Sequence, residues 1–272
     1  MKFENIKVYN IENAIRGMRN PLESWAKSDS FFGVINLNDS EADYDIADEW
    51  VRDKYNPNYP AETNDELDKA HCYYDRWLID NGMLDVDYDH DYAVVAFMGP
   101  NDMDLAKRLI NAGPEHRKFL RQIMVSVDIT APIYWYKEFD TYKIGTTANS
   151  TSTMHKLTSK PITLDCFETG DYCPEVITSG EEIDYFIQFL EGLRQKYVAT
   201  KDKRYWKELV RWLPESWLQT RTVTMNYENL RTMYSQRKNH KLLEWSKTGD
   251  ANVDSFIKFV EKLPYAKEFL IQ

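Results

Sequence analysis

The stretch "RQIMVSVDITAPIYWYKEFDTYK" (Arg121–Lys143) decides the fold. Its first ten residues alternate apolar and polar side chains, which is the pattern of a strand with one buried face. Pro132 stands where the first residue of a helix belongs, because its missing N–H costs nothing there. We therefore expect a strand over 121–130 and a helix over 131–143, joined without a linker.

Strands and helices are mixed on both sides of this stretch. We expect further strands at residues 2–9 and 92–99. Helices are expected at residues 10–19, 42–55, 65–80, 100–113, 181–199, 202–212, 225–236 with a continuation to 246, and 253–263. This order predicts an α+β (mixed α/β) fold with a modest central sheet flanked by helices and a helix-rich C-terminal half.

Several helix ends carry recognisable residues. Asn101 is the expected N-cap of the helix that stops at Gly113. Ser179 and Glu182 have the spacing of a capping box, and Pro214 breaks the C-terminal helices. These signals support a folded chain, as do the 14% aromatic content, 8 Trp and 18 Tyr, which a disordered chain would not contain.

The charge is uneven along the chain. The net charge is −10, which argues against a nucleic acid polymer as partner. Residues 1–104 carry 23 acidic against 9 basic side chains, whereas residues 201–247 carry 11 basic against 5 acidic. A local positive region on an acidic protein suits a small anionic ligand, although ordinary helix-surface charge would give the same counts. We divide the chain into an acidic N-terminal region of unknown role, 1–92, and a domain at 93–272.

The sequence favours a cytoplasmic protein. Its three Cys form no CxxC motif, it opens without a secretory signal, and it has no apolar run of membrane-spanning length. "DVDYDHDY" (Asp85–Tyr92) alternates Asp as calcium loops do, but it lacks the Gly and the closing Glu of an EF-hand. We expect a solvated turn or edge there and no metal site.

Three places bring polar groups together. The first is Glu115-His116 at a helix start, and the second is "YKIGTTANSTSTMHKL" (Tyr142–Leu157), a loop whose amides and hydroxyls suit a phosphate. The third is Arg211–Trp245, where helical spacing places Asn226 and Arg237 near one face. An Arg in that company could bind a carboxylate, a phosphate or an imide edge, or could simply lie on a solvated face.

These three places, in this order, resemble the flavin-dependent thymidylate synthases. That family has an "EH" pair, an "API" helix start, an "RHRxxSxNxxSxR" loop, an "RxxLP" and a late helix with Asn and Arg eleven residues apart. This chain has Glu115-His116, Ala131-Pro132-Ile133, the Thr-rich loop, Arg211 before Leu213-Pro214, and Asn226 with Arg237. The resemblance covers about residues 94–247.

The chain departs from the family pattern at several functional positions. The family's Arg-His-Arg falls on Thr141, Tyr142 and Lys143. Lys143 keeps a charge but loses the bidentate fork, and a lost contact of this kind costs about 1–3 kcal/mol of ligand binding. The other departures are Thr146 for Ser, Met154 for the final Arg, Glu138 for the Gln that contacts the nucleotide, Glu228 for a helix Arg, an inserted residue before Asn149, and small shifts of Arg211 and His240.

The resemblance implies an activity and a set of ligands. It implies reductive methylation of dUMP to dTMP in a homotetramer with shared sites, using FAD, NADPH as reductant and methylenetetrahydrofolate as carbon donor. It assigns catalysis to Arg237, which would polarise the base, and to Ser152. It implies FAD contacts by His116, Thr141, Tyr142, Lys143, Asn149, Asn226, Thr232 and His240. It implies nucleotide contacts by Glu138, Ser150, Thr151, Ser152, Met154, Arg211 and Arg237.

Two alternatives stay open. Glu138 and Met154 would suit methylation or hydroxymethylation of a different pyrimidine nucleotide, because a carboxylate presents another hydrogen-bond pattern than an amide. The missing arginines would suit a non-catalytic nucleotide-binding relative. The retained Arg237, Asn226 and Ser152 favour an enzyme over that reading.

Overall fold

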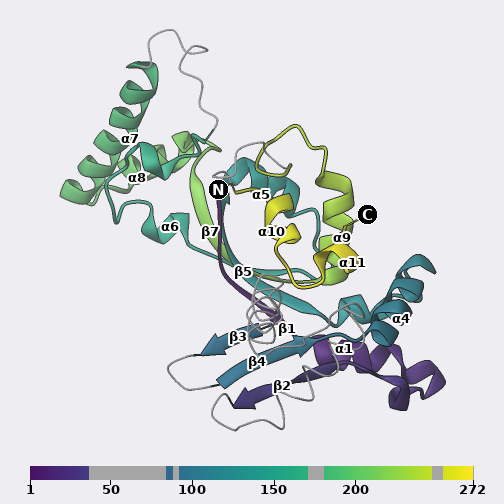
Figure 1. The fold of residues 1–272 in the computed structure, drawn as a ribbon. Helices are drawn as coiled ribbons and strands as arrows, with labels where there is room; N and C mark the ends of the chain where they lie inside the picture. Colours follow the sequence, from purple (N-terminus) through teal and green to yellow (C-terminus); the bar gives the residue numbers. More distant parts are fainter. Residues whose placement is uncertain (37–83, 88–91, 171–180, 247–253, 272) are drawn as a thin grey trace, which may run out of the picture. The chain divides into compact units, whose positions relative to one another are not determined.

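The structure is a computed structural model that describes residues 1–36, 84–87, 92–170, 181–246 and 254–271 (Figure 1). These residues form two compact units, each described here by itself. The first unit contains residues 1–7, 125–225 and 236–259, and the second contains residues 8–124, 226–235 and 260–272. Neither unit is one continuous segment, and the division at residue 92 stays a prediction. The expected helices at 42–55 and 65–80 and the capping box at Ser179 lie outside the described residues.

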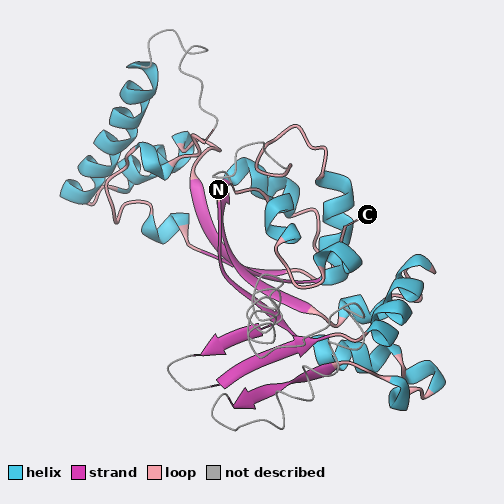
Figure 2. Cartoon of the chain, viewed as in Figure 1, coloured by secondary structure: helices cyan, strands magenta, loops and turns pink. Residues whose placement is uncertain are grey.

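A four-stranded sheet forms the first unit, in the order β1-β5-β7-β6. The strands are β1 (Lys2–Tyr9), β5 (Met124–Pro132), β6 (Thr147–Ser150) and β7 (Leu218–Asn226), drawn in magenta in Figure 2. β5 buries every second side chain, including Val125, Val127 and Ile129. The strand expected over 121–130 is therefore confirmed from Met124 on, because one face of the sheet is packed and the other is partly open, whereas Arg121 ends a short 3-10 helix.

A corner joins β5 directly to α5 (Ile133–Phe139). The amides of Ile133 and Tyr134 donate hydrogen bonds of 3.1 Å each to the carbonyls of Trp217 and Glu215, just before β7. The Tyr136 hydroxyl donates to the Ile129 carbonyl at 2.5 Å. Burial raises the pKa of Tyr136 well above its usual range, so this phenol stays a donor at neutral pH.

Aromatic rings fill the space between α5 and the C-terminal segments of the first unit. Trp135 stacks on Phe139 at 4.9 Å and on Trp245 at 4.4 Å between ring centroids. Trp245 meets Phe256 edge-on at 5.2 Å. Phe256 opens α10 (Phe256–Glu261), and α5 and α10 lie on the same side of the sheet in Figure 1. The stack makes the end of α5 a rigid platform.

A helical hairpin completes the first unit. It consists of α7 (Glu181–Thr200) and α8 (Lys203–Trp212), which pack on each other and on the chain that follows the short helix α6 (Thr153–Lys156). Its core is apolar and consists of Leu157, Ile162, Phe167, Leu190 and Leu209. No helix in the described part of the chain combines the length and the apolar composition that a membrane crossing requires.

The second unit contains a three-stranded antiparallel sheet in the order β2-β4-β3. Its strands are β2 (Phe31–Asn36), β3 (Leu84–Asp87) and β4 (Tyr92–Phe97). The expected strand at 92–99 is confirmed as β4. Of the turn or edge expected over 85–92, Asp85 and Asp87 lie on β3, at the edge of this sheet among the described residues, and residues 88–91 lie outside them. Among the described residues of this unit, the α-helices are α1 (Ile11–Met18), α4 (Pro100–Asn111), α9 (Tyr227–Arg237, which crosses into the first unit at residue 236) and α11 (Ala266–Phe269).

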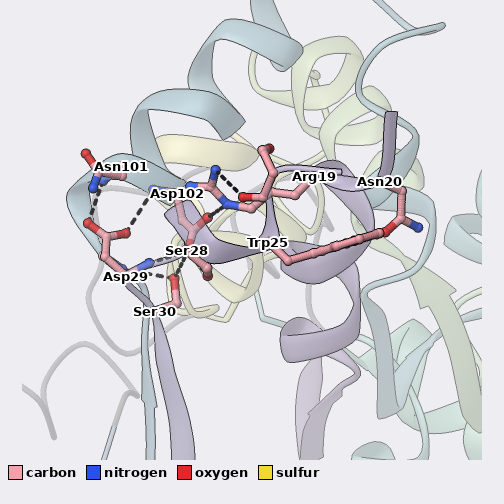
Figure 3. A network of polar contacts seen from close by, with 10 residues as sticks. Arg19, Asn20, Trp25, Ser28, Asp29, Ser30, Asn101 and Asp102 are labelled. Carbon is pink, nitrogen blue, oxygen red and sulfur yellow. Dashed lines mark hydrogen bonds and ion pairs between the residues drawn. The ribbon is translucent and has the colours of Figure 1, made fainter. Parts of the chain in front are cut away.

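A buried polar network fixes the start of α4 (Figure 3). The fully buried Asp102 accepts hydrogen bonds from Arg19 Nε at 2.5 Å, from Ser28 Oγ at 2.6 Å and from Ser30 Oγ at 2.5 Å. The Asp29 carboxylate accepts from the backbone amides of Asn101 and Asp102. Asp29 thus satisfies the first amides of α4, which a helix leaves without intrahelical partners.

Three expected helix ends are wrong. The N-cap of α4 is Gly99 and not Asn101, because Asp29 caps the helix from a distant segment. Pro132 ends β5 and is the N-cap of α5 rather than its first helical residue. The helix expected from residue 253 begins at Phe256, where Ser255 Oγ accepts from the Lys258 amide.

The expected helix at 225–246 differs more strongly. Met225 and Asn226 belong to β7, a strand that we did not predict, and α9 ends at Arg237. Residues 238–246 form turns, because His240 Nδ1 takes the Leu242 amide that a helix would use. Despite these differences the α+β class, with a modest sheet and a helix-rich C-terminal half, is confirmed.

Candidate functional site

The end of α5 and the end of α9 meet in an ion pair within the first unit. Arg237 Nη1 lies 2.5 Å from Glu138 Oε2, and Arg237 Nε donates to the Tyr142 hydroxyl at 2.9 Å. The Arg237 side chain is 18% exposed and that of Glu138 is 33% exposed, so both groups reach solvent. Two residues that lie 99 positions apart in the chain thus share one site, which we call the Arg237 cluster.

His240 completes the cluster on the carboxylate. Its Nε2 lies 3.1 Å from Glu138 Oε2, and its Nδ1 accepts a hydrogen bond from the Leu242 amide at 3.1 Å. Since Nδ1 accepts, the ring proton of the neutral imidazole sits on Nε2 and is donated to Glu138. The Glu138 carboxylate therefore accepts from two donors, the Arg237 guanidinium and the Nε2–H of His240.

An indole ring supports the Arg237 guanidinium. The guanidinium carbon lies 4.9 Å from the ring centroid of Trp245 and 5.5 Å from that of Tyr142. Trp245 is fully buried and stacked on Trp135, so the platform cannot move away. Cation–π contact, a hydroxyl and a carboxylate together fix the direction of the guanidinium fork.

The Thr-rich stretch is partly a strand. β6 pairs antiparallel with β7, with Asn149 opposite Thr222 and Ser150 opposite Arg221. The Thr151 amide donates to the Thr220 carbonyl at 2.9 Å, so this amide is used by the sheet. Ser152 caps α6 by accepting the His155 amide at 3.2 Å. The expectation of a pure loop is therefore wrong, and the hydroxyls that the stretch offers to solvent include those of Ser150 and Thr151.

A second arginine lies beside this stretch. Arg221 Nη1 donates to Asp140 Oδ1 at 2.8 Å, and Arg221 Nε donates to Gln219 Oε1 at 3.0 Å. Its guanidinium carbon lies 3.8 Å from the ring centroid of Tyr136. Sequence reasoning missed Arg221 because it did not recognise β7, although the alternation in "TRTVTMN" over 220–226 could have indicated a strand.

The structure brings four of the predicted site residues together: Glu138, Tyr142, Arg237 and His240. Sequence reasoning missed Trp245, because a single aromatic residue in "LLEWS" does not indicate a contact with Arg237. Of the remaining first-unit residues, Thr141 adjoins the cluster, because its hydroxyl donates to the Glu138 carbonyl at 2.7 Å. Thr141, Lys143, Asn149, Ser150, Thr151 and Met154 are exposed, Ser152 is half-buried, and Arg211 pairs with Glu208 at the end of α8.

Three predicted residues lie in the second unit. His116 is exposed in the turn after α4. Asn226 Oδ1 accepts the Asn229 amide at 2.9 Å and so caps α9, and the Thr232 hydroxyl donates to the Glu228 carbonyl at 3.0 Å. Their assignment to FAD stays a prediction.

The departure at Glu228 has a partner in the structure. Arg117 binds the Glu228 carboxylate through both Nε and Nη2, at distances of 2.9–3.0 Å. Both side chains are less than one-fifth exposed. The acidic residue at 228 is therefore neutralised by the neighbour of His116, and it leaves no bare negative charge.

The comparisons with known proteins rest on structure. No protein-family profile and no curated protein matches the sequence. Two crystal structures of the flavin-dependent thymidylate synthase ThyX from Helicobacter pylori with FAD and dUMP match the fold. Each match covers 100% of this chain and 98% of that chain, with TM-scores of 0.55 and 0.56 at 13% and 12% identity. A UMP/dUMP methylase PolB from Streptomyces cacaoi overlaps 62% of this chain and 85% of its own at 12% identity, with a TM-score of 0.42.

The fold and the site define a class. The chain is an α+β protein that holds a fixed arginine at the end of α9 against a carboxylate on α5, a histidine and an indole. Its fold is that of the flavin-dependent thymidylate synthases, so the resemblance stated from the sequence is confirmed at the level of the fold.

Proposed function

We propose that this protein is a flavin-dependent enzyme that methylates a pyrimidine nucleotide, with dUMP as the substrate and dTMP as the product. The Arg237 cluster is the single observation that carries the proposal. A guanidinium held by an indole, a hydroxyl and a carboxylate has lost its freedom before any ligand arrives, so binding a ligand costs little further ordering. Its fork fits the carbonyl edge of a uracil ring.

Arg237 would act electrostatically. A cation that faces the carbonyl edge stabilises negative charge that develops on the pyrimidine when its C5 carbon is activated. Glu138 and Tyr142 would orient the guanidinium, and His240 would hold Glu138. No nucleophilic side chain is required for this role.

The residues of the first unit fit FAD in part. FAD presents an aromatic ring system and a diphosphate, and the chain offers the Tyr142 ring and the exposed Lys143 ammonium on one short segment. Thr141 and Asn149 would add polar contacts. When bound, the flavin would supply the hydride, with NADPH as its reductant and methylenetetrahydrofolate as the carbon donor. Like the solved ThyX structures, the protein would bind FAD and dUMP together.

The remaining contacts follow the same proposal. The exposed hydroxyls of Ser150 and Thr151 and the half-buried Ser152 would bind the nucleotide phosphate, with Arg211 and the surface near Met154 close to the nucleotide in the assembled enzyme. We propose a homotetramer, in which different subunits would supply the phosphate-binding hydroxyls and the FAD contacts at His116, Asn226 and Thr232.

The visible absorption spectrum of the purified protein tests this proposal. We expect the band of oxidised flavin in the protein as purified or after FAD is added, and a change of that band when dUMP binds beside the flavin. A protein that takes up no FAD at any concentration tested is not a flavoenzyme. The non-catalytic alternative then remains, and dUMP binding without FAD would support it.

A second substrate is favoured by one specific contact. The Glu138 carboxylate can only accept hydrogen bonds, and it lies on Arg237, the group that would face the base. The 4-amino group of cytosine would donate to this carboxylate, whereas the 4-oxo group of uracil would not. Parallel turnover assays with dUMP and dCMP decide between the two bases, and inertness toward both would count against each.

A further inference from the structure

Arg221 is a second firmly held guanidinium beside the Thr-rich stretch. It lies on β7 directly opposite Ser150 of β6, and side chains at opposite positions of an antiparallel pair lie on the same face, about 5 Å apart at Cβ. Val223 and Met225, two and four residues on, are fully buried. The Arg221 side chain thus lies on the packed face of the sheet beside Ser150, in the middle of the Thr-rich stretch.

Three groups position the Arg221 guanidinium before any ligand binds. The Tyr136 ring centroid lies 3.8 Å from the guanidinium carbon, Gln219 accepts from Nε, and Asp140 accepts from Nη1. The Tyr136 hydroxyl is itself tied to β5 through the Ile129 carbonyl, so the platform is rigid. The Arg221 side chain is 16% exposed. It is therefore ordered but still reachable from solvent.

The ion pair with Asp140 is easily exchanged. The Asp140 side chain is 51% exposed, and a pair with a solvated carboxylate contributes at most about 1 kcal/mol. A phosphate dianion carries more charge and three acceptor oxygens, so it competes well for the same fork. Neighbouring hydroxyls would then donate to the remaining oxygens.

We propose that Arg221 binds the 5′-phosphate of the pyrimidine nucleotide, together with the Ser150 hydroxyl. This inference rests on the proposed function and adds to it a residue that binds the phosphate of the nucleotide. It supplies an ordered cation on β7, whereas the Thr-rich stretch has Met154 at the position of the expected Arg and carries its own cations on the exposed Lys143 and Lys156. Asp140 binds the guanidinium and keeps it oriented until the phosphate replaces the carboxylate.

Equilibrium binding of dUMP and of deoxyuridine to the FAD-saturated protein tests the proposal. The two ligands differ only in the phosphate. We expect Arg221→Gln to weaken dUMP binding about 10- to 100-fold and to leave deoxyuridine binding unchanged, because a lost charged hydrogen bond costs about 1.5–3 kcal/mol. Arg221→Lys should restore part of the preference for dUMP over deoxyuridine. Asp140→Asn should tighten dUMP binding, because it removes the competing carboxylate.

The control is Arg204→Gln, which removes a guanidinium that is 89% exposed on α8 and should leave both affinities as in the wild type. Thermal unfolding of each variant reports whether the fold is kept. If Arg221→Gln binds dUMP as tightly as the wild type, or if Asp140→Asn weakens it, the inference is wrong while the proposed function stands. If the wild-type protein binds neither dUMP nor deoxyuridine, the proposed function itself is wrong and the inference falls with it.

Discussion

At the scale of the residue, charge pairs decide what the candidate site can do. Glu138 separates this chain from the pattern it resembles, because it places a carboxylate on the arginine that would face the base. The sequence revealed this substitution, but not that Glu138 also holds His240, since His240 was expected on a helix. Arg237 could be predicted from its spacing to Asn226. Trp245 could not, because its role depends on which segments pack against it, and Arg221 was missed together with the strand that carries it.

Replacing Arg237 tests the proposed electrostatic role. Arg237→Ala should abolish turnover of the nucleotide, and Arg237→Lys should keep only a small part of it, because the ammonium has no fork. Steady-state kinetics measure both effects. FAD content, measured from the flavin band, serves as the control. Turnover of Arg237→Ala at the wild-type rate would contradict the assignment.

Replacing Glu138 tests base selection. Glu138→Gln supplies an amide donor that a 4-oxo group accepts, so the ratio of kcat/KM for dUMP over dCMP should rise about tenfold, equivalent to about 1.4 kcal/mol. Both substrates are assayed with the same enzyme preparation, so differences in folding cancel. An unchanged ratio would mean that the carboxylate does not face the base.

At the scale of the element, strands with clear alternation were predictable and capped helices only partly so. The sequence of β5 alternates apolar and polar residues along most of its length. The sequence of β7 carries Thr and Arg, and most of it was expected to be a break between two helices. The N-cap of α4 was misjudged because its partner, Asp29, lies more than 70 residues earlier in the chain. Long-range partners of this kind have no local sequence signal.

Gly99 lies where a side chain has no room. A Cβ at this position would lie 2.2 Å from the backbone oxygen of Asp29. Gly99→Ala should therefore displace Asp29 from the start of α4 and lower the free energy of unfolding by about 2 kcal/mol or more. Gly192 in α7 is the matched control, because a Cβ there meets nothing within 4 Å. Gly192→Ala should raise the stability by about 0.5–1 kcal/mol, and equal effects of the two changes would contradict this packing.

The α7 hairpin should carry a pH-dependent contribution to stability. Hydrogen bonds from Arg194 lower the pKa of Glu191 from 4.5 to about 2, and the Ile162 amide adds to the effect. A depressed carboxyl pKa stabilises the fold above the unfolded-state value and loses its effect as the pH falls toward the folded-state value. The melting temperature of the wild type should therefore exceed that of Glu191→Gln by the largest amount at pH 7, and this difference should shrink below about pH 4.5. A gap that is the same at pH 7 and pH 3 would exclude this role.

At the scale of the whole molecule, the fold matches the solved ThyX structures along the full chain although the identity is 13% or less. The sequence predicted the class of fold from the order of its elements. It did not predict the two interleaved units, because the chain returns to each of them from distant segments.

The proposed homotetramer has a direct measurement. Sedimentation velocity should show a particle of four 32.2 kDa chains. The exposed aromatic residues of α7, Tyr185 at 65% and Phe189 at 46%, are surfaces that assembly could cover. A monomer at micromolar concentration would contradict sites shared between subunits.

The most direct test follows the flavin itself. The FAD-loaded protein is reduced without oxygen and mixed with methylenetetrahydrofolate, and the return of the oxidised flavin band is recorded with and without dUMP. We predict reoxidation that requires the nucleotide in the wild type and is absent in Arg237→Ala with equal FAD content. A reduced flavin whose reoxidation is indifferent to dUMP, dCMP and Arg237 would contradict a nucleotide-methylating site at the Arg237 cluster.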